Sequence, residues 1–370
     1  MVIDSAYNMP YCGEARERSP NLPGRQSIVT NKRVSIKDVA VRAGVSYQTV
    51  SKVLNGELKV SPATEARIAA SVKELGYHPN HSARSLRTQR SQMIGYSWSS
   101  SETEQLNHIV HMFLTAVVSE AEAAGHHVLP FPYHNGDDQV AGYRELIDAG
   151  RVDGFVLSSV MYDDPRIAFL LERRFPFVAF GRSGPDDDFA YVDVDGAAGL
   201  RLATEHLLQR GHRRIGVLAW AAATRVGDDR LAGYLDALRA AGLPVDTTLI
   251  GRGESDFESG YTVTAGWLSR PPTQRPTAVV AVSDIMAIGA MHAAQAHGFS
   301  VGPDFAVAGF DDVPLAQYMR PPLTSIRQPI RQAGHLCVDL LVALLSGLPL
   351  AERHILLQPE LVIRASTRDS

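Results

Sequence analysis

Cysteine is nearly absent from this chain, since only Cys12 and Cys337 occur in 370 residues. Two cysteines so far apart provide neither a disulfide framework nor the ligand spacing of a zinc site, which fits a reducing cytosol. Long apolar runs are also missing, because none approaches the roughly 18 residues of a membrane span. The first 30 residues contain three prolines and no apolar stretch, so they do not resemble a signal peptide. We therefore predict a disordered tail over residues 1–33 and a cytoplasmic protein without a membrane segment.

Sequence signatures of common enzymes are missing as well. The chain has no G-x-G-x-x-G fingerprint, no phosphate-binding loop, no G-x-S-x-G elbow and no H-E-x-x-H. His108 and His111 lie one helical turn apart and are a possible metal pair, but no third ligand lies near them in the sequence. We therefore expect no catalytic residues, no cofactor and no resident metal.

Charge is distributed unevenly along the chain. Residues 31–90 carry eleven Lys and Arg against four Asp and Glu, a net charge of +7. The whole chain has a net charge of −4 and residues 1–30 are neutral, so residues 91–370 carry −11. A basic head on an acidic body predicts a polyanionic partner for the head alone.

The basic region has the pattern of three short helices. Apolar residues recur at helical spacing over residues 36–43, and Gly44 then permits a sharp turn. Ser46 can cap a second helix, whose residues Tyr47, Gln48, Ser51 and Lys52 point away from its apolar side, and Pro62 starts a third. This spacing predicts a helix-turn-helix DNA-binding headpiece over residues 34–78. A generic three-helix bundle is the alternative.

Residues 79–90 connect this headpiece to the body. Pro79 ends the preceding helix, and a new helix of under ten residues over 81–87 is marginal alone in water. Small Ala83 lets two such helices touch, and Leu86 can wedge between base steps in the minor groove. The segment is predicted to be a hinge helix that forms on DNA, with a plain linker as the alternative.

From residue 91 onward, strand patterns alternate with helix patterns, which predicts parallel sheets covered by helices on both faces. Strands are predicted over residues 93–96, 128–131, 154–157, 177–180, 215–218, 279–282 and 305–309. Helices are predicted over residues 106–124, 140–149, 197–209, 230–241, 285–297 and 330–345. The number of strands favours two similar lobes within residues 91–370, with the chain crossing between them near 190–198 and 321–328. Ligands bind such sheets outside the carboxyl ends of the strands.

Several polar residues are predicted to lie at this edge and to contact an effector. Hydroxyl-rich ligands require carboxylates, guanidinium groups and an aromatic face. Asp195 follows the strand-like YVDV, Arg230 lies in DDRLAGY at a helix start, and Asp311 ends the strand AVAGF. Asp284 follows VVAVS and either contacts the effector or caps its helix. Phe257 is the candidate stacking platform.

Two further effector candidates follow strands of the amino-terminal half. Trp98 comes just after the first predicted strand, and Arg182 follows the strand FPFVAF. The alternatives are a core aromatic for Trp98 and a surface ion-pair arginine for Arg182.

Residues 34–368 resemble the lac/galactose repressor family of bacterial transcription regulators. The resemblance rests on VSIKDVAVRAGVSYQTVSKVLNG, VSPATEARIAASVKELGYHPNHSARSLRT, GHRRIGVL, DDRLAGYLDAL, VVAVSDIMAIGAM, AVAGFDDVPLAQYMRPPLTSIRQP and LVIRAST. It implies an α/β chain with an all-α helix-turn-helix headpiece and a two-lobed body of doubly wound sheets, like a periplasmic binding protein. It also implies that Asp195, Arg230 and Asp311 match effector-contacting positions.

The resemblance further implies a homodimer whose recognition helices enter successive major grooves of a pseudo-palindromic double-stranded DNA operator. Tyr47 and Gln48 match the family's base-reading pair, with Lys52 one turn later, and Leu86 matches its minor-groove lever. A Gln can pair with adenine and a Lys with guanine acceptors. The predicted DNA-binding residues are Ser46, Tyr47, Gln48, Thr49, Ser51, Lys52, Asn55, Ala83 and Leu86.

These features predict a nucleoid-associated repressor of carbohydrate-use genes, controlled by a small sugar-like effector that closes the two lobes. Activation of transcription and corepression by a purine-type effector remain alternatives. A sugar-binding transport protein and an enzyme on a doubly wound fold are further ones. The chain ends soon after its last strand pattern, without heptads, so we expect dimers and not tail-tethered tetramers.

Overall fold

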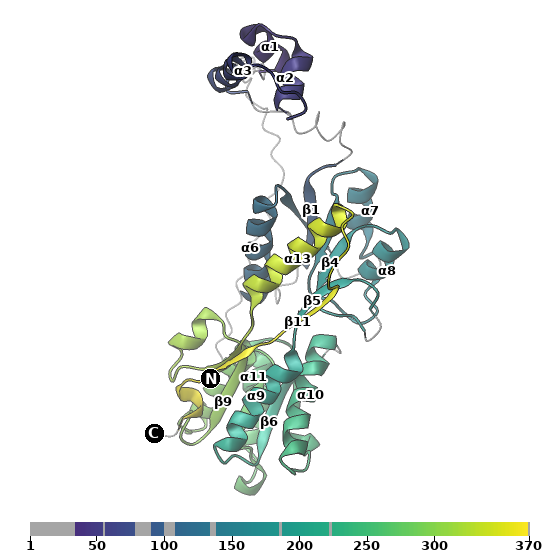
Figure 1. Cartoon of the computed structure of the whole chain (residues 1–370). Helices are drawn as coiled ribbons and strands as arrows, with labels where there is room; N and C mark the ends of the chain where they lie inside the picture. Colours follow the sequence, from purple (N-terminus) through teal and green to yellow (C-terminus); the bar gives the residue numbers. More distant parts are fainter. Residues whose placement is uncertain are drawn as a thin grey trace, which may run out of the picture. The chain divides into compact units, whose positions relative to one another are not determined.

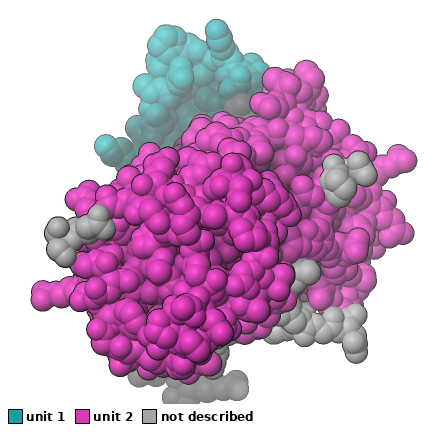
Figure 2. All heavy atoms as spheres, turned by 90° about the horizontal axis from the view of Figure 1, so that it is seen from below, with its two compact units in different colours: residues 1–80 teal, residues 81–370 magenta. Residues whose placement is uncertain are grey.

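The computed structural model describes residues 34–54, 56–77, 90–99, 108–133, 138–184, 187–221 and 224–368. The chain divides into two compact units, residues 1–80 and residues 81–370 (Figures 1 and 2). Most of the predicted hinge segment, and with it Ala83 and Leu86, lies outside the described residues, as do Asn55 and the predicted tail.

Unit 1 consists of three helices, as the sequence predicts: α1 (Ile36–Ala43), α2 (Tyr47–Leu54) and α3 (Pro62–Leu75). Gly44 ends α1 in the left-handed conformation, with φ 66°, which a residue with a Cβ resists. The Ser46 hydroxyl accepts a hydrogen bond from the Thr49 N–H at 3.0 Å and so caps α2. Buried Val39, Val50 and Ile68 join the three helices in one small core.

The first lobe of unit 2 is built on a six-stranded parallel sheet in the order β11-β5-β4-β3-β1-β2 (Figure 1). Its strands are β1 (Met93–Ser99), β2 (His127–Tyr133), β3 (Gly154–Leu157), β4 (Phe177–Phe180), β5 (Ala190–Val194) and β11 (His354–Leu357). Its helices are α6 (His108–Ala123), α7 (Ala141–Asp148), α8 (Pro165–Glu172) and α13 (Ile330–Leu345). Two buried apolar clusters lie in this lobe, one including residues of α6 and α13 and the other residues of α7 and α8.

The second lobe has a six-stranded sheet in the order β12-β10-β9-β8-β6-β7, in which β12 alone pairs antiparallel. Its strands are β6 (Ile215–Trp220), β7 (Ile250–Gly253), β8 (Ala278–Ala281), β9 (Ala306–Asp311), β10 (Thr324–Arg327) and β12 (Glu360–Val362). Its helices are α9 (Gly196–Gln209), α10 (Arg225–Ala240), α11 (Phe257–Leu268) and α12 (Asp284–Ala296). Short 3-10 turns lie at Thr247–Leu249, Pro272–Gln274, Pro314–Tyr318 and Ala365–Thr367. The doubly wound architecture confirms the predicted α/β class.

The chain passes between the lobes three times. It leaves the first sheet after β5 at Asp195, returns after β10 and leaves again between β11 and β12. The third passage is absent from the sequence prediction, because β11 and β12 are short strands at the sheet edges. The segments predicted as crossings also contain strands, since β5 and β10 are full members of their sheets.

Four details of the elements differ from the prediction. The helix carrying Arg230 begins at Arg225 and not at residue 230, because the Thr224 hydroxyl accepts from the Gly227 N–H at 3.0 Å and caps it there. Helices α8 and α11 and strand β7 occupy segments where none was predicted.

In the described part of the chain, no helix has the length and apolarity to cross a membrane.

Candidate functional site

The predicted recognition helix α2 presents its polar side chains to solvent. Ser46, Tyr47, Gln48 and Lys52 are exposed, whereas Thr49 is half-buried. Ser51 is half-buried too. Buried Val50 anchors the opposite side of the helix against α1 and α3. The capped first turn is thereby held, while Tyr47, Gln48 and Lys52 are exposed to solvent.

Arg230 is the centre of the candidate effector site. It lies in the second turn of α10 with 5% of its surface exposed, and its Nη1 donates to the Val282 carbonyl at the end of β8. Its Nη1 lies 3.7 Å from Asp311 Oδ1. Its guanidinium carbon stands 3.8 Å from the Phe310 ring centroid and 5.1 Å from that of Trp220. In the described structure, its buried Nε has no hydrogen-bond partner.

Asp311 ends β9 in a strained backbone conformation, with φ 118°. Gln328 Nε2 donates to its Oδ1 at 2.7 Å. Burial raises the pKa of Asp311 to about 6, although the Arg230 guanidinium and the Gln328 amide favour its charged form. The carboxylate is therefore ionised at neutral pH and becomes protonated in mild acid.

Asp284 lies beside this pair and is fully buried. Asp284 is the first residue of α12, so it has the position that its predicted alternative role at the helix N-terminus requires. Its carboxylate accepts from the Val313 N–H at 2.8 Å and from the Ser325 hydroxyl at 2.6 Å. Burial and the charge of Asp311 raise its pKa well above the ordinary range. Gly309 makes room for it, since a Cβ there would lie 2.1 Å from Asp284 Oδ1.

The structure thus brings together Arg230, Asp311 and Asp284 of the predicted effector residues. Asp195 caps α9 through the Ala198 N–H at 2.8 Å, and the next residue, Gly196, lies against the Arg230 side chain. Asp195 is therefore a neighbour of the site.

The other three predicted effector residues contact partners other than Arg230, Asp311 and Asp284 in the described structure. Phe257 stands at the start of α11, with its ring centroid 5.2 Å from that of His292 on α12, so it packs between two helices. Trp98 lies near the end of β1 with 43% of its surface exposed. Arg182, after β4, forms ion pairs with Asp193 and Asp229.

Two groups near Arg230 are missing from the sequence prediction. The Trp220 ring faces the guanidinium, and its buried Nε1 has no hydrogen-bond partner in the described structure. The Ser255 hydroxyl donates to the Ser283 hydroxyl at 3.2 Å, close to the end of β8. Trp220 ends the strand IGVLAW, so the same rule that selected Asp311 would have found it.

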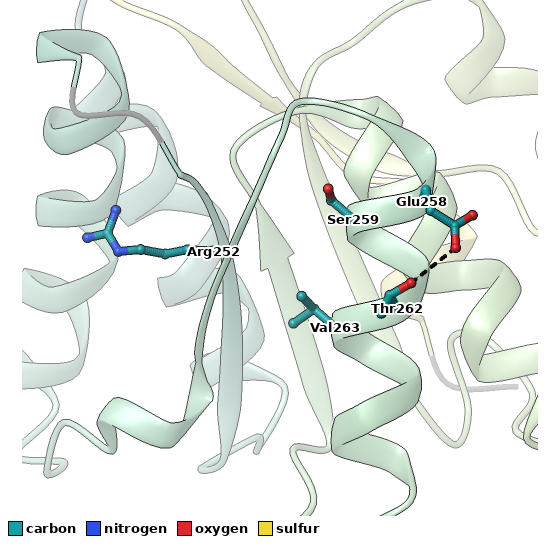
Figure 3. A pocket seen from close by; sticks show the side chains of 5 residues that line it. All are labelled: Arg252, Glu258, Ser259, Thr262 and Val263. Atoms are coloured by element: carbon teal, nitrogen blue, oxygen red, sulfur yellow. Dashed lines mark hydrogen bonds between the residues drawn. The ribbon is translucent and has the colours of Figure 1, made fainter.

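A separate hollow of about 270 Å³ lies between β7 and α11 (Figure 3). Arg252, Glu258, Ser259, Thr262 and Val263 line it, and the Thr262 hydroxyl donates to Glu258 Oε1 at 3.2 Å. It has no aromatic wall and is smaller than the roughly 300–1,000 Å³ of ligand pockets. None of the predicted effector residues lines it.

Two family models match the chain. Residues 35–80 match the bacterial regulatory proteins of the lacI family, and residues 204–367 match a periplasmic binding protein-like domain. The HTH-type transcriptional regulator CelR of Thermobifida fusca is 35% identical over 342 residues, which span 90% of this chain and 98% of CelR.

Three solved structures share the fold. A LacI-family regulatory protein from Chloroflexus aggregans is 55% identical, with a TM-score of 0.72 over 74% of this chain and 98% of that chain. A CelR–cellobiose complex is 32% identical, with a TM-score of 0.69 over 90% of this chain and 100% of that chain. The lac repressor dimer bound to operator and the anti-inducer ONPF is 31% identical, with a TM-score of 0.80 over 91% of this chain and 100% of that chain. The chain therefore belongs to the lacI family of bacterial regulatory proteins and is a DNA-binding transcriptional regulator.

Proposed function

We propose that the protein represses carbohydrate-use genes and is controlled by a neutral sugar that binds between its two lobes. It acts in the cytoplasm, at the nucleoid, as a homodimer on a pseudo-palindromic operator. In this proposal residues 34–78 are the headpiece, 79–90 the hinge and 91–370 the effector-binding and dimerisation domain, behind a tail of residues 1–33. The similarity to CelR and to the lac repressor dimer on its operator supports this assignment.

The exposed face of α2 reads the operator in this proposal. Gln48 pairs with an adenine edge and Lys52 donates to guanine acceptors, while Tyr47 packs beside them in the major groove. Ser46, Thr49, Ser51 and Asn55 complete the contacts of this helix, and Ala83 and Leu86 serve the minor groove. The exposure of Tyr47, Gln48 and Lys52, set against buried Val50, supports this reading.

The observation that carries the effector assignment is the buried Arg230–Asp311 pair. Since Asp311 already compensates the guanidinium, the site has no excess positive charge to attract a phosphate or carboxylate. It does offer donors on Arg230 and Gln328, acceptors on Asp311, the Ser283 hydroxyl and the indole of Trp220. Charge-assisted hydrogen bonds to hydroxyls, with an aromatic wall, suit a neutral oligosaccharide.

Control of DNA binding follows from linkage between the two ligands. An effector that binds better to the lobes in one arrangement shifts the population toward that arrangement. The factor by which the effector changes operator affinity equals the factor by which the operator changes effector affinity. Induction by the sugar is the version that we propose.

A thermal-shift panel on the full-length protein tests the effector class. Cellobiose, other neutral disaccharides, a phosphorylated sugar and a nucleobase are compared, with and without an operator fragment. Saturation at 100 times Kd stabilises a protein by about 2.7 kcal/mol, so a neutral sugar should raise the melting temperature by several degrees and lower operator affinity. Arg230→Met should abolish both effects. Shifts from the phosphorylated sugar or the nucleobase alone would overturn the proposal, and turnover of the sugar would indicate an enzyme.

A further inference from the structure

Two polar contacts connect the first lobe to helix α10 of the second lobe. Arg182 Nη2, after β4, lies 2.6 Å from Asp229 Oδ2. The Tyr162 hydroxyl, between β3 and α8, donates to Asp228 Oδ2 at 3.1 Å. Asp228 and Asp229 are consecutive residues in the first turns of α10, and the next residue is Arg230. The contacts between lobes and the centre of the effector site therefore share one helix.

The Arg182 side chain is held in place within its own lobe. Its Nε donates to Asp193 Oδ2 at 2.8 Å, and the Asp193 side chain on β5 is only 7% exposed. The other oxygen of Asp193 accepts from the Val194 N–H at 2.8 Å. With its carboxylate fixed at both oxygens, Asp193 orients the guanidinium, whose Nη2 reaches Asp229 of the other lobe.

The segment that carries Tyr162 is also ordered from within the first lobe. Asp164 and Arg166 form an ion pair whose side chains are both 2% exposed. Arg166 Nη2 donates to the carbonyls of Ser158 and Ser159, and Asp164 Oδ2 accepts from the Met161 N–H at 3.3 Å. These bonds fix the backbone on both sides of Tyr162.

Helix α10 belongs firmly to the second lobe. It packs against α9 so closely that a Cβ on Gly233 would lie 2.0 Å from the Ala197 carbonyl oxygen. Asp229 additionally pairs with Arg225 of its own helix at 3.1 Å. A change in the angle between the lobes therefore breaks the bond from Arg182 to Asp229 and leaves the bond from Arg225 intact.

We propose that Arg182 is a positioning residue for the effector site. Through its ion pair with Asp229, Arg182 holds α10 against the first lobe and sets the fraction of molecules in which Arg230 faces that lobe. This inference rests on the proposed function in one respect, namely that the effector binds between the lobes. It changes the predicted role of Arg182 from a ligand contact to a residue that acts through Asp229. The Arg182 and Asp229 side chains are 15% and 20% exposed, so the pair is only partly screened by water.

The test measures the distance between the lobes in the full-length protein without any sugar. Spin labels are placed on exposed positions of α8 and α10 as Glu172→Cys and Ala240→Cys in a Cys12→Ser background. Mixing with excess unlabelled protein leaves one labelled copy per dimer. Double electron–electron resonance should give one dominant and one minor distance population for the parent, and Arg182→Met should enrich the minor population roughly tenfold.

Arg225→Met is the matched control, because it also removes a cation from Asp229 but no bond between lobes. It should keep the parent distribution. Asp229→Asn leaves the Arg182–Asp193 pair intact and should reproduce the effect of Arg182→Met, with no further change in the double variant. Arg182→Lys keeps the positive charge and should retain much of the parent population. If Arg182→Met acted only through lost packing, this charge would not rescue the population.

Identical distributions for Arg182→Met, Arg225→Met and the parent would overturn the inference. With cellobiose as the probe, Arg182→Met should also raise the Kd about tenfold, whereas Arg225→Met should leave it unchanged. If no sugar binds but the distances still depend on Arg182, the proposed effector class fails and the positioning role stands.

Discussion

Acidification through pH 6 should weaken effector binding through Asp311. Burial raises the pKa of this carboxyl to about 6, and it raises the pKa of neighbouring Asp284 well above the ordinary range. At pH 7 Asp311 is ionised and faces the Arg230 guanidinium at 3.7 Å. A sugar hydroxyl that donates to Asp311 loses a charged acceptor when this group takes up a proton.

The size of the effect follows from the titration. A group with a pKa of about 6 is roughly 90% ionised at pH 7 and roughly 10% ionised at pH 5. The affinity for a sugar identified by the thermal-shift panel should therefore fall about tenfold between these two values. Protonation of Asp311 has the opposite effect on the free energy of unfolding, which it increases, because the folded protein binds the proton more tightly than the unfolded chain. The contribution of Asp311 to the free energy of unfolding is largest below pH 4 and is lost as pH rises to about 6, by up to about 3 kcal/mol.

Isothermal titration calorimetry of the full-length protein with the sugar identified by the thermal-shift panel, from pH 5 to pH 8, measures the affinity. Urea unfolding measures the stability. Asp311→Asn fixes the neutral form, so its affinity should be low and independent of pH. Its free energy of unfolding relative to the parent should rise between pH 4 and pH 7. Glu172→Gln, on the exposed end of α8, is the carboxylate control. A parent affinity that increases on acidification, or an Asn variant with the parent's pH profile, would refute the reasoning.

Four further variants test other parts of the molecule. Arg230→Ala should abolish the sugar response in a gel-shift assay while operator binding stays intact, and a normal response would remove Arg230 from the site. Gln48→Ala, or Tyr47→Ala, should lose about 1–3 kcal/mol of preference for operator over random DNA yet keep salt-sensitive binding. Undiminished preference contradicts that assignment. Gly233→Ala should lower the free energy of unfolding by about 1–3 kcal/mol, because its Cβ would meet the Ala197 carbonyl at 2.0 Å; unchanged urea midpoints would show that α9 and α10 can separate.

Most of the fold could be predicted because its central strands are continuous apolar runs. Strands β3 and β4 and helix α13 have the bounds that the sequence predicts. Helix α11 was missed because FESGYTVTAGWL is rich in glycine and β-branched residues, which disfavour isolated helices. Close packing of α11 against α12 outweighs this weak helix propensity. Gly260 lies so close to the Met286 carbonyl on α12 that a Cβ would stand 2.1 Å from it.

The candidate effector site was partly predictable for a related reason. Residues that end parallel strands gather at one edge of a sheet, and this rule alone finds Asp311 and would have found Trp220. The role of Arg182 could not be predicted, because its partner Asp229 lies 47 residues away on the other lobe. Phe257 fits the chemistry of a stacking platform, but its place on α11 puts the ring against α12.

Helix α10 couples lobe closure to effector binding, because it carries both a contact to the first lobe and the central residue of the proposed effector site. Asp229 contacts the first lobe, and Arg230 is the central residue of the proposed effector site. Both lie on one helix that packs closely against α9 and moves with it as a rigid body. A sugar that favours the arrangement in which Arg230 faces the first lobe therefore also favours the Arg182–Asp229 bond. Because such coupling is reciprocal, the factor by which that bond increases sugar affinity must equal the factor by which the bound sugar strengthens the bond.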